Sequence, residues 1–537
     1  MSHFSRKNSI DAVIVGAGFS GLYMLHLLRG MGLSAQVIEA GPSVGGTWYW
    51  NSYPGARCDV ESLNYCYTFD PQLQREWQWT ERYPAQPEIL RYLNHVADRF
   101  DLRRDIALGV RVSASHYDDK SGQWKVSTDD GRDISAQFCI MATGCLSTAR
   151  LPDIPGLNKF RGRWFHTGQW PQTPIDFTGE AVGVIGTGST GIQLIPTVAR
   201  QARKLVVFQR TPNFSVPARN RPLTQKEVEE HNAIFEEHNR QARISLFGVP
   251  WPLNMQMALD DAPQARRERY EAAWTAGGAT PMLTSYIDLL ANEKANETAA
   301  DFVREKIRGI VKDPDVAALL SPKDHPIGTK RICVDTDYYA TFNRNNVELV
   351  DLKSSPIVEI TEEGVRTAAA SLKLDSLIFA TGFDAMTGSL FAIDIRGRGG
   401  LKLQEKWNQG PRSYLGLMSE GFPNLFTVTG PGSPSVLSNV VVSIEQHVEW
   451  IAACIRHMRT SGKRIIEPLL ASENKWVEHV NEVANTTLYP KANSWYVGAN
   501  IPGKPRVFTP YVGGVGTYRQ LCDEIAAKGY EGFRLDA

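Results

Sequence analysis

The chain has 537 residues, more than one hydrophobic core normally serves, so we expect two or three domains rather than a single small module. Lysine plus arginine equals aspartate plus glutamate at 58 each, which leaves no global charge to attract nucleic acid or an anionic membrane surface. This balance favours a small neutral substrate over a polyanionic partner.

The cysteines and the N-terminus bear on the cellular compartment. Seven cysteines are spread along the chain without a CxxC pair, which argues against a disulfide framework, a zinc site and a dithiol redox centre. Residues 1–10 lack the apolar core of a signal peptide, and no apolar run approaches the length of about 18 residues that a membrane span needs. We therefore expect a cytoplasmic protein without a metal site or membrane contact.

The first predicted unit consists of a strand, a glycine loop, a helix and a second strand. Residues 11–15 form a short apolar run typical of a buried parallel strand, and residues 22–29 have helical spacing. A GxGxxG match alone is weak, but here strand, helix and a terminal acid are in register with it, which predicts a dinucleotide site. The residues of this predicted site are Gly16, Gly18, Ser20, Gly21 and Glu39.

The acid at the end of the second strand indicates which dinucleotide binds. Glu39 follows the apolar run of residues 34–38 and can accept hydrogen bonds from free ribose hydroxyls, whereas it would repel a 2′-phosphate. The first site therefore suits FAD or NAD. Its N-terminal placement favours FAD.

The same pattern returns at residues 181–211. A strand pattern at residues 181–185 is followed by a second glycine loop, and the next strand leads into Arg210 and Thr211. A guanidinium and a hydroxyl at this position favour the 2′-phosphate of NADPH, with a solvated surface arginine as the alternative. The residues of this predicted site are Gly186, Thr187, Gly188, Ser189, Thr190, Gly191, Arg210 and Thr211.

Two such units predict an α/β fold with two dinucleotide-binding Rossmann-like domains. Short strands that end in Ala-Thr-Gly, at residues 142–144 and 380–382, indicate where the chain passes between them. Residues 215–325 are charged and helical in pattern, which indicates an insertion in the second domain. The predicted boundaries are 1–145 and 382–537 for an FAD-binding domain, 146–214 and 326–381 for an NADP-binding domain, and 215–325 for the insertion.

The segment between the two glycine loops narrows the chemistry. Residues 160–171 read FRGRWFHTGQWP, which matches the FxGxxxHxxxWP fingerprint of Baeyer–Villiger monooxygenases at every fixed position. Flavin-containing and N-hydroxylating monooxygenases are similar here but do not usually end in Trp-Pro. The chain thus resembles the Baeyer–Villiger family, its phenylacetone and steroid subtypes most of all. The matching residues are Phe160, Gly162, His166, Trp170 and Pro171.

The resemblance implies an enzyme that reduces FAD with NADPH and oxidises a ketone with O2 through a C4a-peroxyflavin held as an anion. An anion of this kind attacks a carbonyl as a nucleophile, so the site needs a fixed positive charge that cannot give up a proton. The family match assigns this charge to Arg331 and the carboxylate that holds it to Asp59. A purely structural ion pair between domains is the alternative.

Further family matches complete the two nucleotide sites. Lys330 matches a lysine that binds the 2′-phosphate, and Trp495 matches a tryptophan that packs on the nicotinamide riboside. His166 is expected to couple hydride transfer to oxygen transfer through domain movement, with direct acid–base chemistry as the alternative. The residues matched to flavin contacts are Thr47, Trp48, Tyr65 and Val112, of which Trp48 and Tyr65 could equally serve as core packing.

The family's substrate loop resembles residues 430–440, which are small or aliphatic, so a hydrophobic ketone is implied. Cys145 stands where a phenylacetone-type enzyme has glutamine, and Val440 where it has methionine. Both side chains are shorter, which favours a wider pocket for aryl, cyclic or steroidal ketones. The predicted substrate residues are Cys145, Leu146, Ser435, Val436, Leu437 and Val440.

Other classes of protein stay open at this point. A flavin-containing monooxygenase that oxidises nitrogen or sulfur needs a protonated hydroperoxide, and therefore a neutral side chain in place of Arg331. An NADPH oxidase or reductase, or a redox-responsive binding protein, needs neither the Trp170-Pro171 ending nor Asp59 with Arg331. The first expectation remains a ketone-oxidising enzyme that is a monomer or a weak homo-oligomer and binds no nucleic acid.

Overall fold

In the computed structural model of the chain, residues 9–537 are described. The first of two large sheets is mixed, because β5 runs antiparallel to both of its neighbours while the other pairings are parallel. Its strands lie in the order β17 (Asp394–Arg396), β4 (Val112–Asp118), β5 (Gln123–Thr128), β6 (Asp133–Met141), β1 (Ser9–Val15), β2 (Ala35–Glu39) and β3 (Ile106–Leu108), with β18 (Leu425–Thr427) beside β6.

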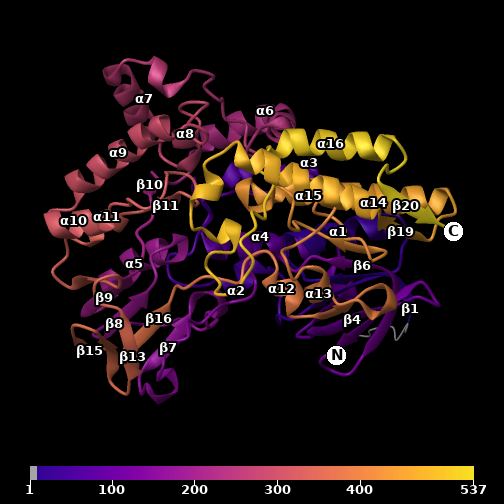
Figure 1. Cartoon of the computed structure of the whole chain (residues 1–537), viewed down its shortest axis with the longest axis horizontal. Helices are drawn as coiled ribbons and strands as arrows, with labels where there is room; N and C mark the ends of the chain where they lie inside the picture. The colour runs from indigo at the N-terminus through magenta and orange to yellow at the C-terminus, as the bar shows by residue number, and fades with distance from the viewer. Residues whose placement is uncertain (1–8) are drawn as a thin grey trace.

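The second large sheet is parallel throughout. It lies on the other side of the molecule from the first in Figure 1. Parallel strands need helical crossovers and are buried on both faces, which explains their unbroken apolar runs. The strands lie in the order β12 (Val347–Asp351), β9 (Lys204–Gln209), β8 (Ala181–Ile185), β16 (Ser376–Phe379) and β7 (Arg163–His166).

Each glycine loop joins a strand of one sheet to a helix. β1 leads into α1 (Phe19–Gly30), and β8 leads into α5 (Ser189–Gln201). Both helices begin directly after the second glycine of the loop, and α1 is longer than the helical spacing of residues 22–29 indicates. The matching strands β6 and β16 end immediately before the two Ala-Thr-Gly segments.

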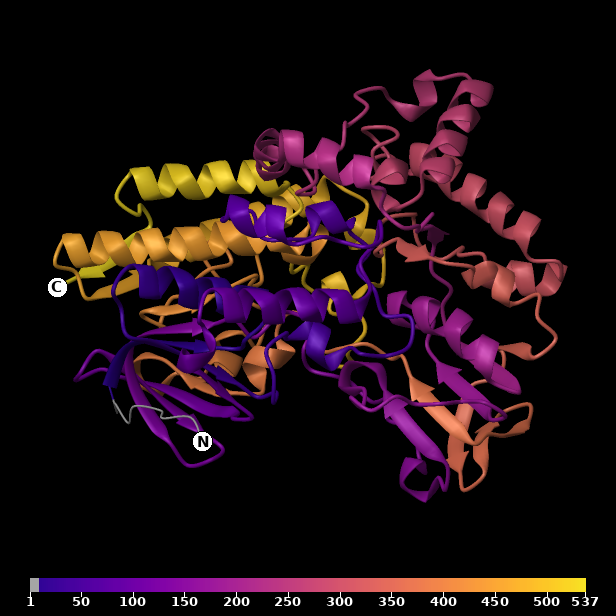
Figure 2. The same ribbon diagram turned by 180° about the vertical axis from the view of Figure 1, so that it is seen from behind.

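The C-terminal helices pack on the first sheet rather than on the second. α14 (Val440–Thr460) lies against α1, and α15 (Leu470–Asn485) and α16 (Val515–Ala527) lie near it in Figures 1 and 2. One hydrophobic core joins Leu22 and Leu25 of α1 to Ile444 and Ile451 of α14. The chain therefore returns to its N-terminal sheet after completing the second one.

Residues 215–325 are mainly helical and pack beside the second sheet. The segment opens with β10 (Ser215–Pro217), a short strand that the charge pattern does not indicate, which pairs with β11 (Cys333–Asp335). Its α6 contacts α16, so the segment also reaches the C-terminal layer. The helices are α6 (Gln225–Ile244), α7 (Pro263–Ala276), α8 (Ala279–Leu283), α9 (Glu293–Ile310) and α10 (Pro314–Leu320).

The remaining elements are shorter or peripheral. The helices are α2 (Thr47–Trp50), α3 (Pro71–Glu76), α4 (Gln86–Arg99), α11 (Tyr338–Thr341), α12 (Gly388–Phe391) and α13 (Leu403–Lys406). The strands are β13 (Ile357–Thr361), β14 (Gly364–Thr367), β15 (Ser371–Lys373), β19 (Ile465–Pro468) and β20 (Phe533–Asp536). Among the helices of residues 9–537, none combines the length and hydrophobicity that crossing a bilayer requires. All seven cysteines are free thiols.

Candidate functional site

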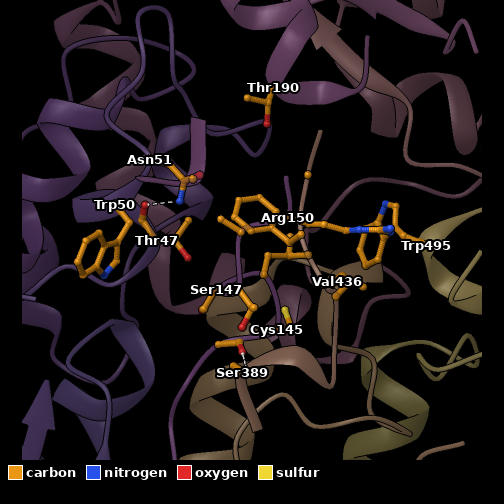
Figure 3. A pocket seen from close by; sticks show the side chains of 18 of the residues that line it. Thr47, Trp50, Asn51, Cys145, Ser147, Arg150, Thr190, Ser389, Val436 and Trp495 are labelled. Atoms are coloured by element: carbon orange, nitrogen blue, oxygen red, sulfur yellow. Dashed lines mark hydrogen bonds between the residues drawn. The ribbon is translucent and has the colours of Figure 1, made fainter. Parts of the chain in front are cut away.

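A single cavity of about 1460 Å3 is lined by both glycine loops and by segments from all parts of the chain except the helices of residues 215–325. Figure 3 shows part of its wall, with Thr47 and Asn51 on one side and Val436 and Trp495 on the other. The structure thus brings the two predicted nucleotide sites to one cavity.

Most of the predicted site residues line this cavity. They are Gly16, Gly18, Ser20, Glu39, Thr47, Trp48, Asp59, Tyr65, Val112, Cys145, Leu146, Gly186, Thr187, Gly188, Ser189, Thr190, Arg210, Thr211, Arg331, Val436, Val440 and Trp495. The predicted residues that do not line it are Gly21, Gly191, Lys330, Ser435, Leu437 and the fingerprint residues Phe160, Gly162, His166, Trp170 and Pro171.

The two glycine loops have matching geometry. A Cβ at Gly21 would lie 1.8 Å from the Gly16 carbonyl oxygen, and one at Gly191 would lie 2.2 Å from that of Gly186, so these glycines let each helix start tightly against its strand. A Cβ at Gly188 would meet nothing within 4 Å, and this residue has φ −83°, which any amino acid can adopt. Neither packing nor backbone conformation explains Gly188.

The loop geometry fits a bound dinucleotide at both sites. The N-caps of α1 and α5 make no side-chain hydrogen bond, so the first backbone N–H groups of both helices are left for another partner. A pyrophosphate at a helix N-terminus takes up such donors and needs a close backbone approach, which a side chain at Gly188 would obstruct. A phosphate group would account for the open space at Gly188.

Glu39 ends β2 and is 5% exposed. Its carboxylate accepts hydrogen bonds from the backbone N–H groups of Ala17 (2.7 Å) and Gly41 (2.6 Å). Because Ala17 is part of the first glycine loop, these bonds hold the carboxylate beside that loop. Burial raises the pKa of Glu39, and these two hydrogen bonds oppose that effect. The side chain lines the cavity, where a ribose hydroxyl would reach it.

At the second site the corresponding positions are basic. Arg210 follows β9 and is exposed at the cavity wall. Burial lowers the pKa of Lys330; the negative charge of Asp324 opposes this, and the positive charge of Arg210 adds to it. The two cations therefore lie close enough to repel each other, and an anion between them would relieve the repulsion.

Arg331 and Asp59 form a bidentate ion pair at the cavity wall. Arg331 Nε and Nη2 donate to the two carboxylate oxygens of Asp59 at 2.6 Å and 2.8 Å. Burial disfavours both charges, but the attraction outweighs it, so the pKa of Asp59 is lowered and that of Arg331 is raised. Both groups stay ionised, as a bidentate arginine–carboxylate pair should.

Three further contacts position this pair, and sequence patterns do not reveal them. Arg331 Nη1 donates to the backbone carbonyl of Val436 at 2.7 Å. Gln193 of α5 accepts from the Tyr53 hydroxyl at 2.9 Å and donates to the Arg57 carbonyl at 3.0 Å, which fixes the segment that carries Asp59. Burial raises the pKa of Tyr496 to about 12, against the nearby positive charge of Arg331.

The fingerprint residues belong to the framework of the linker. His166 ends β7 and is 3% exposed; its Nδ1 accepts from the Gly168 N–H at 3.0 Å, and its Nε2 faces the Arg150 carbonyl at 3.2 Å. Burial lowers the pKa of His166, so its ring is neutral at pH 7, with Nε2 as the donor. Trp170 packs with Phe165 and Phe177.

Cys145, Leu146, Val436 and Val440 all line the cavity, and the first three belong to one hydrophobic cluster. Ser435 and Leu437 flank Val436 on a single helical turn and do not line the cavity, although Leu437 packs in the same hydrophobic cluster as Cys145 and Leu146. Trp48 donates through its indole N–H to the Tyr65 hydroxyl at 3.2 Å, and both rings are buried in the first core as well as lining the cavity. Within residues 9–537, no cluster of three histidine, cysteine, aspartate or glutamate side chains could hold a metal ion.

Comparison with known proteins agrees with this geometry. Residues 10–219 match the flavin-binding monooxygenase-like family. The chain is 42% identical to a Baeyer–Villiger monooxygenase of Pseudooceanicola batsensis over 97% of this chain and 95% of the relative. It is also 42% identical to a phenazine N-monooxygenase of Lysobacter antibioticus, over 98% of this chain and 97% of the relative.

A solved structure supports the same assignment. Oxidised steroid monooxygenase bound to NADP superposes with a TM-score of 0.94 at 50% identity, covering 98% of this chain and 99% of that one. Identity at this level over the full length shows family as well as fold. The chain belongs to the Baeyer–Villiger monooxygenases, flavoenzymes that use NADPH and O2 to oxygenate ketones.

Proposed function

We propose that this chain converts hydrophobic ketones to esters or lactones, with FAD and NADPH as cofactors. The observation that carries the proposal is the Arg331–Asp59 ion pair in the wall of the cavity that both glycine loops share. A paired arginine keeps its proton, which is what an anionic oxidant beside it requires.

The residues of each loop support one cofactor. Gly16, Gly18 and Ser20 with Glu39 would hold FAD, because a buried carboxylate suits free ribose hydroxyls. The loop of residues 186–191 with Arg210, Thr211 and Lys330 would hold NADPH. When bound, NADPH supplies a hydride and FAD supplies the means of activating O2.

Arg331 would act on developing negative charge. Three of its five N–H donors are used by Asp59 and Val436, so two remain for an oxygen atom in the cavity. The fixed neighbours hold the guanidinium in place before the reaction, and preorganised charge of this kind is worth about 3–4 kcal/mol per donor. Trp495 would pack against the nicotinamide end of NADPH, and His166 would hold the linker in register.

The substrate walls favour an apolar ketone. Cys145, Leu146, Val436 and Val440 offer short, weakly polar side chains around the space near Arg331. Aryl, cyclic and steroidal ketones are the proposed class. Ser435 and Leu437 would shape this wall indirectly by fixing Val436 between them.

The domain arrangement is part of the proposal. An FAD-binding domain of residues 1–145 and 382–537 is supported by the core that α1 and α14 share. An NADP-binding domain of residues 146–214 and 326–381 carries the helical insertion of residues 215–325, whose buried side chains join those of β8 and β9 in one core. The free thiols support a cytoplasmic location, and we propose a monomer or weak homo-oligomer.

Oxygenation of nitrogen is the second candidate, because one relative of equal identity is an N-monooxygenase. That chemistry needs a protonated oxidant. A permanent cation facing the cavity disfavours it, and on that ground ketones remain the first choice.

One experiment separates these candidates. The purified flavoprotein is supplied with NADPH, 18O2 and either phenylacetone or cyclohexanone, and the products are identified by mass. An ester or lactone that carries one 18O supports the proposal. Hydrogen peroxide alone from a broad ketone panel would show an oxidase, and an N-oxide from phenazine without any ester would show an N-oxygenase.

A further inference from the structure

The cavity wall contains one half-buried arginine that has no carboxylate partner within residues 9–537. Three of the six arginines that line it, Arg111, Arg210 and Arg506, are exposed to solvent. The other three are half-buried: Arg57, Arg150 and Arg331. Arg57 pairs with Glu81 at 2.6 Å and Arg331 pairs with Asp59, whereas Arg150 forms no ion pair within the described part of the chain.

The backbone of Arg150 is fixed by hydrogen bonds, whereas most N–H donors of its guanidinium make none within residues 9–537. Its backbone carbonyl accepts hydrogen bonds from Thr381 Oγ1 at 2.6 Å and from His166 Nε2 at 3.2 Å, which fixes where the side chain starts. One guanidinium nitrogen donates to the carbonyl oxygen of Asn500, and no other side-chain hydrogen bond of Arg150 occurs among residues 9–537. A guanidinium has five N–H donors, so most are available.

The side chain of Arg150 extends toward Trp495. In the view of Figure 3 it crosses the cavity, with Val436 and Cys145 drawn nearby. Arg150 also lies on the same segment as Cys145 and Leu146, five and four residues further along the chain. Trp495 packs in one hydrophobic cluster with Cys145, Leu146 and Val436, so the charge of Arg150 lies where the proposed ketone region borders the nicotinamide end of NADPH.

A structural role alone does not account for an arginine here. The bond to the Asn500 carbonyl needs one N–H donor and no charge, so it does not by itself require a cation in a confined, partly apolar space. Charge removed from water is costly unless an opposite charge compensates it. An anionic oxygen group, which arginine binds in a planar, two-donor geometry, supplies that compensation.

The anion at Arg150 is not a cofactor phosphate if those phosphates have other binding partners, and the proposed function gives each of them one. In the proposed function, the N-termini of α1 and α5 bind the pyrophosphates, and Arg210 and Lys330 bind the 2′-phosphate of NADPH. Neither cofactor then leaves a phosphate for Arg150. We infer that Arg150 binds a carboxylate carried by the substrate, so that the preferred ketones of this enzyme are keto acids with an apolar body. This inference rests on the proposed function and deepens it by naming the substrate class.

The test compares two ligands that differ at one end only, where one carries a carboxylate and the other its neutral methyl ester. Binding of 4-oxo-4-phenylbutanoate and of its methyl ester to the holoenzyme with NADP+ is measured by isothermal titration, and kcat/KM is measured for both. The variants are Arg150→Gln, which keeps an N–H donor but removes the charge, Arg150→Lys, which keeps the charge, and Arg161→Gln. Arg161 is a matched control, because it lies on the same linker, pairs with Glu362 and is 76% exposed.

We expect wild type to bind the acid more tightly than the ester. Arg150→Gln should weaken acid binding by about 10-fold or more and leave ester binding within about twofold, since losing a charged hydrogen bond has an effect of this size. Arg150→Lys should recover part of the acid preference, and Arg161→Gln should behave as wild type.

Two results would overturn the inference. Equal weakening of acid and ester would mean that Arg150 only positions the loop around Asn500. A loss of NADP+ affinity with no change in the acid-to-ester ratio would assign its anion to the cofactor. A failure of the proposed function would be recognised differently. In that case wild type would form no ester or lactone product from any ketone, while the keto acid would still bind more tightly than its methyl ester.

Discussion

Arg331 and Asp59 are 272 residues apart in the chain, yet two hydrogen bonds of 2.6 Å and 2.8 Å join their side chains. Asp59 follows α2 beside the first glycine loop, and Arg331 stands just before β11, beyond the helices of residues 215–325. The ion pair therefore forms only when these distant segments dock. The position of the Arg331 cation at the cavity wall thus depends on how the segments that carry Asp59 and Arg331 are arranged.

Replacement of Arg331 should separate oxygenation from flavin reduction. We expect Arg331→Ala to lower ester formation by at least about 100-fold, because a preorganised charge is lost where negative charge develops. Arg331→Lys, which keeps the charge but not the two-donor geometry, should fall between the alanine variant and wild type. Ester is measured by mass, and reduction by NADPH is measured anaerobically from flavin absorbance.

The NADPH-dependent reduction serves as the internal control. It should change much less than ester formation, with electrons passing instead to hydrogen peroxide. If Arg331→Ala retained wild-type ester formation, the cation would have no part in the reaction, and the pair with Asp59 would be only structural.

Two glycines of the second loop should respond differently to alanine. At Gly188 a Cβ meets nothing within 4 Å, so Gly188→Ala should change the free energy of unfolding by less than about 1 kcal/mol while it obstructs the phosphates and weakens NADPH binding. At Gly191 a Cβ would lie 2.2 Å from a backbone oxygen, so Gly191→Ala should destabilise the fold by about 1–3 kcal/mol.

Thermal unfolding and NADPH titration of the two variants check this contrast. Each variant is the control for the other, because both add one methyl group to the same loop. Wild-type NADPH affinity in Gly188→Ala would show that the open space above the loop is not a phosphate site.

The glycine loops could be predicted from the sequence because their signals are local. Strand, loop, helix and the residue at the second strand's end lie within about 30 residues, and each position is set by the geometry of one βαβ unit. The Arg331–Asp59 pair spans 272 residues, and only a likeness to a family with known chemistry connected them.

Other parts of the site depend on tertiary contacts that leave no pattern. The Val436 carbonyl accepts from Arg331, but the sequence of a loop does not say where a carbonyl points. The sequence does not distinguish Arg150 from the other arginines of the linker. Only the structure shows that it has no carboxylate partner within residues 9–537. Pairing of β10 with β11 was equally hidden, because three-residue strands carry too little periodicity to detect.

Replacement of Arg210 should weaken the preference for NADPH over NADH. We expect Arg210→Ala to weaken NADPH binding by about 10- to 100-fold, because a charged hydrogen bond to the 2′-phosphate is lost, and to leave NADH binding unchanged. Dissociation constants come from the concentration dependence of anaerobic flavin reduction. Arg203→Ala removes an equally charged, exposed side chain just before the same strand and should alter neither.

Equal weakening of NADPH and NADH in Arg210→Ala would contradict this assignment. It would mean that Arg210 supports the loop rather than the phosphate. Lys330→Ala is expected to act in the same direction as Arg210→Ala, because the two cations already lie close together.

A buried carboxylate on α14 should make the stability of the protein fall as pH rises. Glu445 is 1% exposed and accepts hydrogen bonds from the Thr68 N–H at 2.6 Å, the Thr68 hydroxyl at 2.5 Å and the Phe69 N–H at 3.1 Å. Burial raises its pKa from 4.5 to about 7, with Glu449 raising it further and Arg243 lowering it.

The sign of the effect follows from which state releases its proton first. Between pH 4.5 and 7 the unfolded chain ionises at Glu445 while the folded chain keeps the proton, so folding becomes less favourable across this window and levels off above it. A difference of about 2.5 in pKa corresponds to about 3 kcal/mol. Glu445→Gln, which cannot ionise, should therefore gain stability relative to wild type as pH rises from 5 to 7.5. Unfolding temperatures of both proteins at several pH values measure this, and Glu478→Gln, at an exposed position, is the control. If the difference in unfolding temperature between wild type and Glu445→Gln did not change with pH, Glu445 would be ionised throughout this range.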